Sequence, residues 1–291
     1  MAMTHAPATL TDRLDPHMRA ILDAAPPLRS LDIDGMRRHA VDAKARWNDR
    51  VTVSVSDTND ALCVSSPGTA GVPIVHLHGG GWSIGSPETH LSLLAGLAHA
   101  TGRRVIAPRV PQAPEHPYPR PLDATLAALA DRGTERFVLS GDSAGANLAL
   151  AAMLKAKDLG QSLPVLGLVL SYGCFRRRFD TESHRRFGEG HGLTTGKMQQ
   201  FWQFYAPEGG AYADLTDADV SGLPPVQLHL AECDPLADDT HWLHDRLSAS
   251  GVATELLIWP RMAHGFLHYA SDLPQARDAF AQTARFIEER S

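Results

Sequence analysis

The sequence predicts an α/β fold in which a mostly parallel sheet of eight strands carries helices on both faces. Six strand candidates are continuous apolar runs, which is the pattern of strands that are covered on both sides. Most gaps between these runs contain a helical pattern such as LDATLAALADR, and a hairpin precedes the series. At 291 residues the chain has the length of one large domain rather than two.

The elements follow in chain order. Residues 1–48 contain two amphipathic helical segments, LDPHMRAILDAA and IDGMRRHAVDAKARWN. Residues 51–56 and 61–65 are the strands of the hairpin, because the polar run between them is a good turn. The six apolar strands comprise residues 73–77, 104–107, 136–140, 165–171, 226–230 and 255–259.

One gap, between Ser171 and Val226, is much longer than the others. It contains LTTGKMQQFWQFY, a predicted helix with Thr194 as its N-cap. The apolar stripe of this helix needs a partner surface, and the amphipathic N-terminal helices are available. We therefore expect a small helical cap, made of residues 1–48 and an insertion at about 175–222, over a catalytic domain of residues 49–291. The stripe consists of Met198, Phe201, Trp202 and Tyr205.

The segment FVLSGDSAGANLALAAMLKA places Ser143 between an apolar strand and an Ala/Leu-rich helix, with glycine two residues before and after it. A serine on such a strand–turn–helix is the nucleophile elbow of a hydrolase, where small neighbours let the backbones approach closely. Ser83 matches the same G-x-S-x-G pattern, but it follows three glycines and precedes a proline, which indicates a loop. Ser143 is therefore the predicted nucleophile.

A serine nucleophile needs a histidine base and a carboxylate that orients the histidine. Two strand ends supply them: Asp234 follows the strand at 226–230, and His264 follows the strand at 255–259. The chain order Ser143, Asp234, His264 is the order of α/β-hydrolases. Three other carboxylates near the first of these strand ends remain alternatives for the acid: Glu232, Asp238 and Asp239.

The run His78-Gly-Gly-Gly-Trp82 follows the strand at 73–77. Acyl transfer requires amide N–H groups aimed at the oxygen that becomes negative, and glycines let the backbone come that close. The predicted donors are the N–H groups of Gly79 and Gly80, joined by that of Ala144, the residue after the nucleophile.

Composition argues against several other classes of protein. A net charge of −6 argues against nucleic acid as a partner. Three cysteines without CxxC spacing favour reduced thiols in a cytoplasmic protein, and no apolar run is long enough to span a membrane. Among 15 histidines, the pairs 76/78, 241/244 and 264/268 have no third ligand at metal-site spacing, so we expect no metal and no cofactor.

The motifs together resemble the hormone-sensitive-lipase family of α/β-hydrolases, in its bacterial carboxylesterase branch. The matching pieces are HGGGW at 78–82, APEHPYP at 113–119, GDSAG at 141–145, DPL at 234–236 and HGF at 264–266. The resemblance implies the α/β-hydrolase fold, a cap of N-terminal helices and an insertion after the sixth strand, and cofactor-free ester hydrolysis. It also implies that Glu115 organises the region below the oxyanion loop. Dimers are common among resembling enzymes, so a homodimer paired through the edge of the last strand is a further expectation.

The predicted function is therefore a serine carboxylesterase that acts on short-chain acyl esters as its small-molecule partners. We expect the substrate pocket to contain Trp82 and three aromatic residues of the insertion, Phe201, Trp202 and Tyr205. Two alternatives stay open. An amide hydrolase of the aryl-formamidase kind uses the same triad, and a non-catalytic small-molecule receptor can be built on the same fold.

Overall fold

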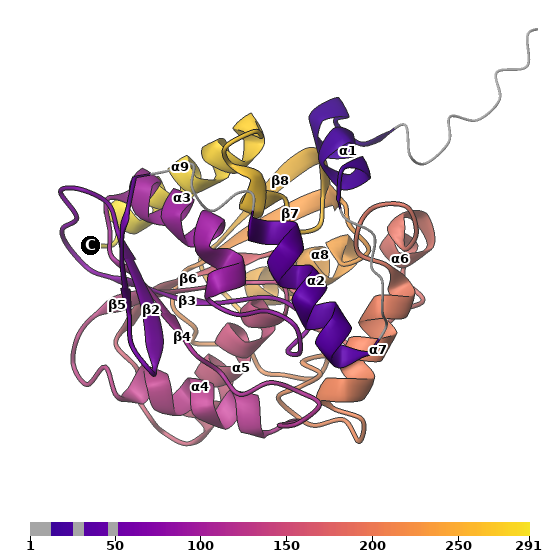
Figure 1. The fold of residues 1–291 in the computed structure, drawn as a ribbon. Helices are drawn as coiled ribbons and strands as arrows, with labels where there is room; N and C mark the ends of the chain where they lie inside the picture. Colours follow the sequence, from indigo (N-terminus) through magenta and orange to yellow (C-terminus); the bar gives the residue numbers. More distant parts are fainter. Residues whose placement is uncertain (1–12, 26–31, 46–51) are drawn as a thin grey trace, which may run out of the picture.

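The computed structural model describes residues 13–25, 32–45 and 52–291 and contains the predicted eight-stranded sheet (Figure 1). The strand order is β1-β2-β4-β3-β5-β6-β7-β8. β1 pairs with β2, and β2 with β4, in antiparallel orientation, whereas all remaining pairs are parallel. The strands are β1 (Ser54–Asp57), β2 (Ala61–Ser65), β3 (Ile74–Leu77), β4 (Val105–Pro108), β5 (Phe137–Asp142), β6 (Val165–Ser171), β7 (Val226–Cys233) and β8 (Thr254–Ala263).

Each predicted strand has its counterpart in the sheet, including the hairpin of β1 and β2. Residue 51, the first of the predicted hairpin, lies outside the described residues. The helices are α1 (Pro16–Asp23), α2 (Ile33–Ala45), α3 (Leu91–Thr101), α4 (Arg120–Ala130), α5 (Ala144–Asp158), α6 (Glu182–Phe187), α7 (Thr195–Tyr205), α8 (Ala237–Ala249) and α9 (Pro274–Glu288), with short 3-10 helices η2 (Glu88–His90) and η3 (Phe266–Tyr269).

Two hydrophobic cores lie on opposite faces of the sheet. Successive side chains of a strand point to opposite faces, and β5 shows the consequence. Phe137 and Leu139 belong to the core that α4, α5 and α8 cover, whereas Val138 belongs to the core under α3 and α9. Continuous apolar strands are therefore buried on both sides, as the sequence pattern predicts, and Figure 1 shows the two helical layers.

The insertion between β6 and β7 contains α6 and α7, and the hydroxyl of Thr194 caps α7 by accepting the N–H of Lys197 at 3.1 Å. All four residues of the predicted apolar stripe are buried. Aromatic members of the stripe pack on the glycine loop after β3. The ring of Tyr205 stacks on Trp82 at 4.3 Å between centroids, and Trp202 meets Trp82 edge-on at 4.8 Å. The stripe therefore covers the predicted oxyanion loop.

The N-terminal region contains α1 and α2, as predicted; residues 1–12, 26–31 and 46–48 of that region lie outside the described part. The α1 end is tied to β8, because the Asp15 N–H donates to the Arg261 carbonyl at 3.0 Å. Within the segments that the structure describes, no helix has both the length and the apolar character needed to cross a membrane. β8 forms one edge of the sheet, and pairing of two chains at this edge stays a prediction.

Candidate active site

Ser143 lies on a strained turn between β5 and α5. Its φ of 53° and ψ of −121° lie where non-glycine residues are rare, and such strain concentrates at functional sites. The turn is held by the Ser143 N–H, which donates to the Ser171 carbonyl on β6 at 2.9 Å. A side chain at Gly145 would overlap the carbonyl oxygen of Leu77 on β3. The glycine is therefore required for the close approach of α5 to the sheet.

The imidazole of His264 lies between Ser143 and Asp234. Its Nε2 is 3.0 Å from the Ser143 hydroxyl, and its Nδ1 is 2.7 Å from one oxygen of the Asp234 carboxylate. The second carboxylate oxygen accepts the Leu236 N–H at 2.9 Å, so the buried Asp234 has a fixed orientation. A carboxylate can only accept, hence Nδ1 carries a proton and Nε2 is free to take one from the serine.

The three alternative carboxylates for the catalytic acid are hydrogen-bonded to groups other than His264. Glu232 accepts the Arg261 N–H at 2.8 Å, and Asp238 accepts the Ser183 N–H at 2.9 Å. Asp239 is buried against Arg176 at 2.9 Å, and burial raises the pKa of its carboxyl to about 6 despite that partner. The structure therefore brings Asp234, the predicted acid, to the histidine.

Ser83, the rival serine, is fully buried, and its backbone carbonyl accepts the side chain of Arg37 at 2.9 Å. No histidine ring among the described residues is hydrogen-bonded to its hydroxyl. Of the two serines, Ser143 is therefore the one that combines the strained turn with a hydrogen-bonded histidine.

The loop after β3 differs from the prediction at one residue. The Gly79 N–H donates to the Asp142 carboxylate at 2.8 Å, so it is directed to the buried side of the loop, and the expectation that it faces a substrate oxygen is wrong. The next two glycines, Gly80 and Gly81, line the cavity above Ser143. Across residues 13–25, 32–45 and 52–291, the N–H groups of Gly80, Gly81 and Ala144 have no acceptor.

The cavity above Ser143 has a volume of about 240 Å³, which lies below the range of about 300–1,000 Å³ that is usual for drug-sized ligands. Its walls come from α2, α7, η2 and the loops after β3, β5 and β8. Phe201 lines the cavity as predicted. The expectation that Trp82, Trp202 and Tyr205 also line it is wrong, because these three rings pack on one another, Tyr205 stacked on Trp82 and Trp202 edge-on to it, and none of them lines the cavity.

The fold and this geometry agree with a family model described as the alpha/beta hydrolase fold, which matches residues 74–268. The chain belongs to the α/β-hydrolase family. It is 34% identical to the carboxylesterase NlhH of Mycobacterium tuberculosis, over 71% of this chain and 70% of the relative. It is 30% identical to the acetyl esterase of Salmonella agona, over 96% of this chain and 95% of the relative.

Solved esterase structures superpose closely on this α/β-hydrolase. An esterase from the bacterial hormone-sensitive lipase family matches with a TM-score of 0.84 and 28% identity, over 99% of each chain. A thermostable esterase from Pseudomonas putida matches with a TM-score of 0.86 and 26% identity, also over 99% of each chain. The resemblance seen in the sequence motifs is thereby confirmed over the whole fold.

The α/β-hydrolase carries a buried cluster of charge next to the turn of Ser143. Asp142 has His76 and His90 at 3.3 Å and His268 at 3.8 Å. Burial by itself raises the pKa of Asp142, but the histidines around it, His76, His90 and His268, outweigh burial and hold the pKa well below its usual range. The cluster was not predicted, because its four members lie on separate elements and no local spacing marks them.

Glu115 joins α2 to the glycine loop of the α/β-hydrolase. The guanidinium of Arg37 on α2 donates to both Glu115 oxygens, at 2.9 and 2.7 Å, and also to the carbonyls of Ser83 and Ala113. The hydrogen bond with Arg37 lowers the pKa of Glu115 to about 2. This placement agrees with the organising role that the family resemblance implies for Glu115.

Proposed function

We propose that this α/β-hydrolase is a serine carboxylesterase that hydrolyses short-chain acyl esters through an acyl-enzyme. The observation that carries the proposal is the unbroken hydrogen-bonded series of Ser143, His264 and Asp234 at the floor of the cavity. The curated relatives named carboxylesterase and acetyl esterase support ester hydrolysis as the reaction.

In the proposed reaction, the Ser143 hydroxyl attacks the ester carbonyl while His264 Nε2 takes the hydroxyl proton. Asp234 holds the imidazole in the required tautomer and stabilises the imidazolium that forms. His264 then protonates the leaving alcohol, and the tetrahedral intermediate collapses to an acyl-serine. Water attacks the acyl-serine with the same base, which releases the acid and regenerates the serine hydroxyl.

The oxyanion of the tetrahedral intermediate needs donors that face the cavity. We assign this role to the N–H groups of Gly80, Gly81 and Ala144. All three lack an acceptor among the described residues, and the two glycines line the cavity. Loss of one such donor costs about 10²- to 10³-fold in kcat in a well-studied serine protease. Gly79 has a different role, since its N–H anchors the glycine loop to the Asp142 carboxylate.

The walls above the site define the proposed substrate size. α2 and the insertion helix α7 form one side of the cavity, and in the proposed function they act as the cap. The ring of Phe201 lies so close to Gly81 that a side chain there would overlap it. A cavity of about 240 Å³ closed by this ring favours acyl groups of two to six carbons.

Hydrolysis of a p-nitrophenyl acyl series from acetate to laurate tests the proposal. The wild type is expected to prefer short chains, and Ser143→Ala is expected to lose several orders of magnitude in kcat. Ser83→Ala is the matched control, because it removes the other serine of the same motif without touching the His264 hydrogen bond.

Two results would favour one of the alternative functions, an amide hydrolase or a non-catalytic receptor. Faster cleavage of matched anilides than of esters would indicate an amide hydrolase. Failure of an organophosphonate to label Ser143, together with no turnover of esters or amides, would indicate a ligand-binding protein instead.

A further inference from the structure

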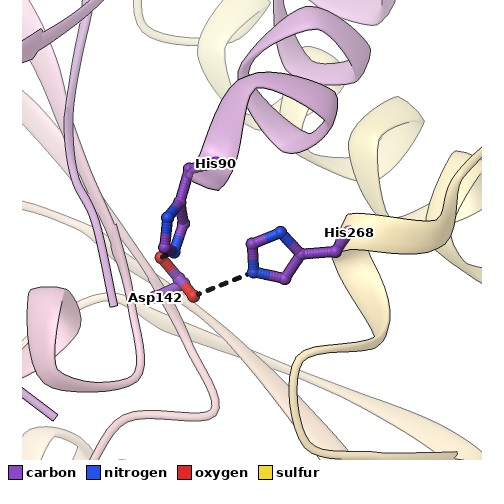
Figure 2. A group of neighbouring side chains, drawn as sticks. All are labelled: His90, Asp142 and His268. Carbon is purple, nitrogen blue, oxygen red and sulfur yellow. Dashed lines mark ion pairs between the residues drawn. The ribbon is translucent and has the colours of Figure 1, made fainter. Parts of the chain in front are cut away.

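Three side chains from distant parts of the sequence converge at the carboxyl end of β5 (Figure 2). His90 lies at the end of η2, Asp142 at the end of β5 and His268 in η3. Each offers one potential ligand atom, and these atoms all lie within 4.8 Å of one another. All three side chains are buried, with 2–4% of each residue exposed. Two imidazoles and one carboxylate at this spacing are the ligand types of a transition-metal site.

The surroundings of His90 determine which ring nitrogen carries its proton. Its Nδ1 lies 3.0 Å from the carbonyl oxygen of Ser86, which can only accept, and 2.9 Å from the hydroxyl of Thr89. Since that hydroxyl donates its own proton to the Ser86 carbonyl at 2.9 Å, Nδ1 is the donor. Its Nε2 lies 3.1 Å from the N–H of Gly79, which can only donate, so Nε2 presents a lone pair. The same Nε2 lies 3.3 Å from Oδ1 of Asp142, the oxygen that also accepts the Gly79 N–H.

The Asp142 carboxylate has one oxygen engaged and one that faces the cluster. Oδ1 accepts the Gly79 N–H at 2.8 Å and lies 3.3 Å from His76 Nε2. Oδ2 is the atom 3.8 Å from His268 Nε2. Carboxylate ligands of metals are commonly hydrogen-bonded through their other oxygen, and histidine ligands commonly donate their second N–H to a carbonyl. Asp142 and His90 both have such support.

We propose that His90 Nε2, Asp142 Oδ2 and His268 Nε2 form a reversible binding site for one zinc-like divalent cation, with water as a further ligand. Tetrahedral zinc with bonds of about 2.0–2.2 Å holds neighbouring ligand atoms about 3.4 Å apart. Asp142 Oδ2 lies 3.8 Å from His268 Nε2, which is close to that value. One ligand atom from each of the three residues lies within 4.8 Å of the others, and small rotations of the side chains shorten that spread.

The ion has a route to this site. His90, Asp142 and His268 all line the cavity that opens above Ser143, so the ion enters where the proposed ester enters. Bound there, it would take the lone pair of His90 Nε2 that accepts the Gly79 N–H, and so loosen the glycine loop. We therefore expect the occupied site to inhibit turnover of esters, although binding of the ion does not depend on the proposed function.

Binding is measured on the full chain after removal of metal with a chelator. Titration of zinc against a competing fluorescent chelator is expected to show one buried site per chain, with micromolar or tighter affinity. Replacement of zinc by cobalt is expected to give the visible absorption of a four-coordinate ion. His268→Gln is expected to weaken binding at least tenfold and to abolish that absorption.

The control is His244→Gln, which removes a half-exposed histidine of α8, one helical turn from His241. It is expected to bind zinc as the wild type does. Should His268→Gln fail to fold by circular dichroism, Asp142→Asn replaces it in the same titration. Absence of a stoichiometric site in the wild type would overturn the proposal. So would unchanged affinity in the folded cluster variant, or a loss of affinity in His244→Gln as large as in that variant.

Discussion

The carboxylate of Asp142 is expected to act on turnover through the glycine loop, and Asp142→Asn tests this because it removes the charge while keeping the shape. Asp142 accepts the Gly79 N–H at 2.8 Å and lies among three histidines. A hydrogen bond to a charged group contributes about 1.5–3 kcal/mol, roughly twice a neutral one. We therefore expect the free energy of unfolding to fall by about 2 kcal/mol in Asp142→Asn.

Turnover is expected to fall as well, since Gly79 is followed directly by the proposed oxyanion donors. If the loss of anchoring costs the transition state about 1.4–2.7 kcal/mol, kcat falls by about 10- to 100-fold while KM changes little. The assay is p-nitrophenyl acetate hydrolysis, read beside a urea denaturation curve at the same temperature, so that the folded fraction is known.

The matched control is Asp239→Asn. Asp239 is a second buried carboxylate, and it accepts the N–H groups of Phe175 and Arg176 at 2.9 Å together with the Arg176 side chain. None of these groups lines the cavity. This variant is expected to lose stability but to keep its kcat. The reasoning is refuted if Asp142→Asn keeps kcat within about twofold of wild type, or if Asp239→Asn loses as much kcat as Asp142→Asn.

Three further predictions follow from single contacts. Gly145→Ala places a methyl group on the Leu77 carbonyl, so we expect at least about 2 kcal/mol less stability by urea denaturation, whereas Gly160→Ala, on an open turn, should lose less. Burial lowers the pKa of His229 to about 3, so the folded state keeps it neutral and its contribution to stability is lost as pH falls from about 6.5 toward 3. The wild type should thus lose about 1.4 kcal/mol more than His229→Gln between pH 7.5 and 5.5; equal losses would contradict the assignment. Phe201→Ala opens the cavity wall. It should improve kcat/KM for octanoyl relative to butanoyl esters by up to about fourfold for each added CH2. An unchanged chain-length profile would show that this ring does not limit the length of the acyl group.

Much of this fold could be predicted because its signals are local. A continuous apolar run such as VLGLVLS at β6 indicates a strand covered on both faces wherever the rest of the chain lies. The elbow at Ser143 depends on glycines two residues away, and a cap such as Thr194 depends on an amide three residues away. His264 and Asp234 could be chosen because each follows a strand, and the carboxyl ends of parallel strands share one edge of the sheet.

The apolar stripe on α7 shows what sequence periodicity does not predict. Periodicity correctly predicts that Trp202 and Tyr205 share a buried face, but it contains no information about the surface opposite them. That surface is Trp82 in the glycine loop, so these two rings pack away from the cavity, whereas Met198 and Phe201 of the same stripe line it.

The sequence by itself determined the strands along the chain, the turn at Ser143 and the choice of His264 and Asp234 as its proposed base and acid. Each of these depends on neighbours within a few residues or on the shared edge of a parallel sheet. Only the tertiary structure decided where the Gly79 amide points and that His90, Asp142 and His268 meet beneath Ser143. The direction of one N–H and the convergence of side chains from positions 90, 142 and 268 depend on how β5, η2 and η3 pack together, and no spacing along the chain encodes that packing.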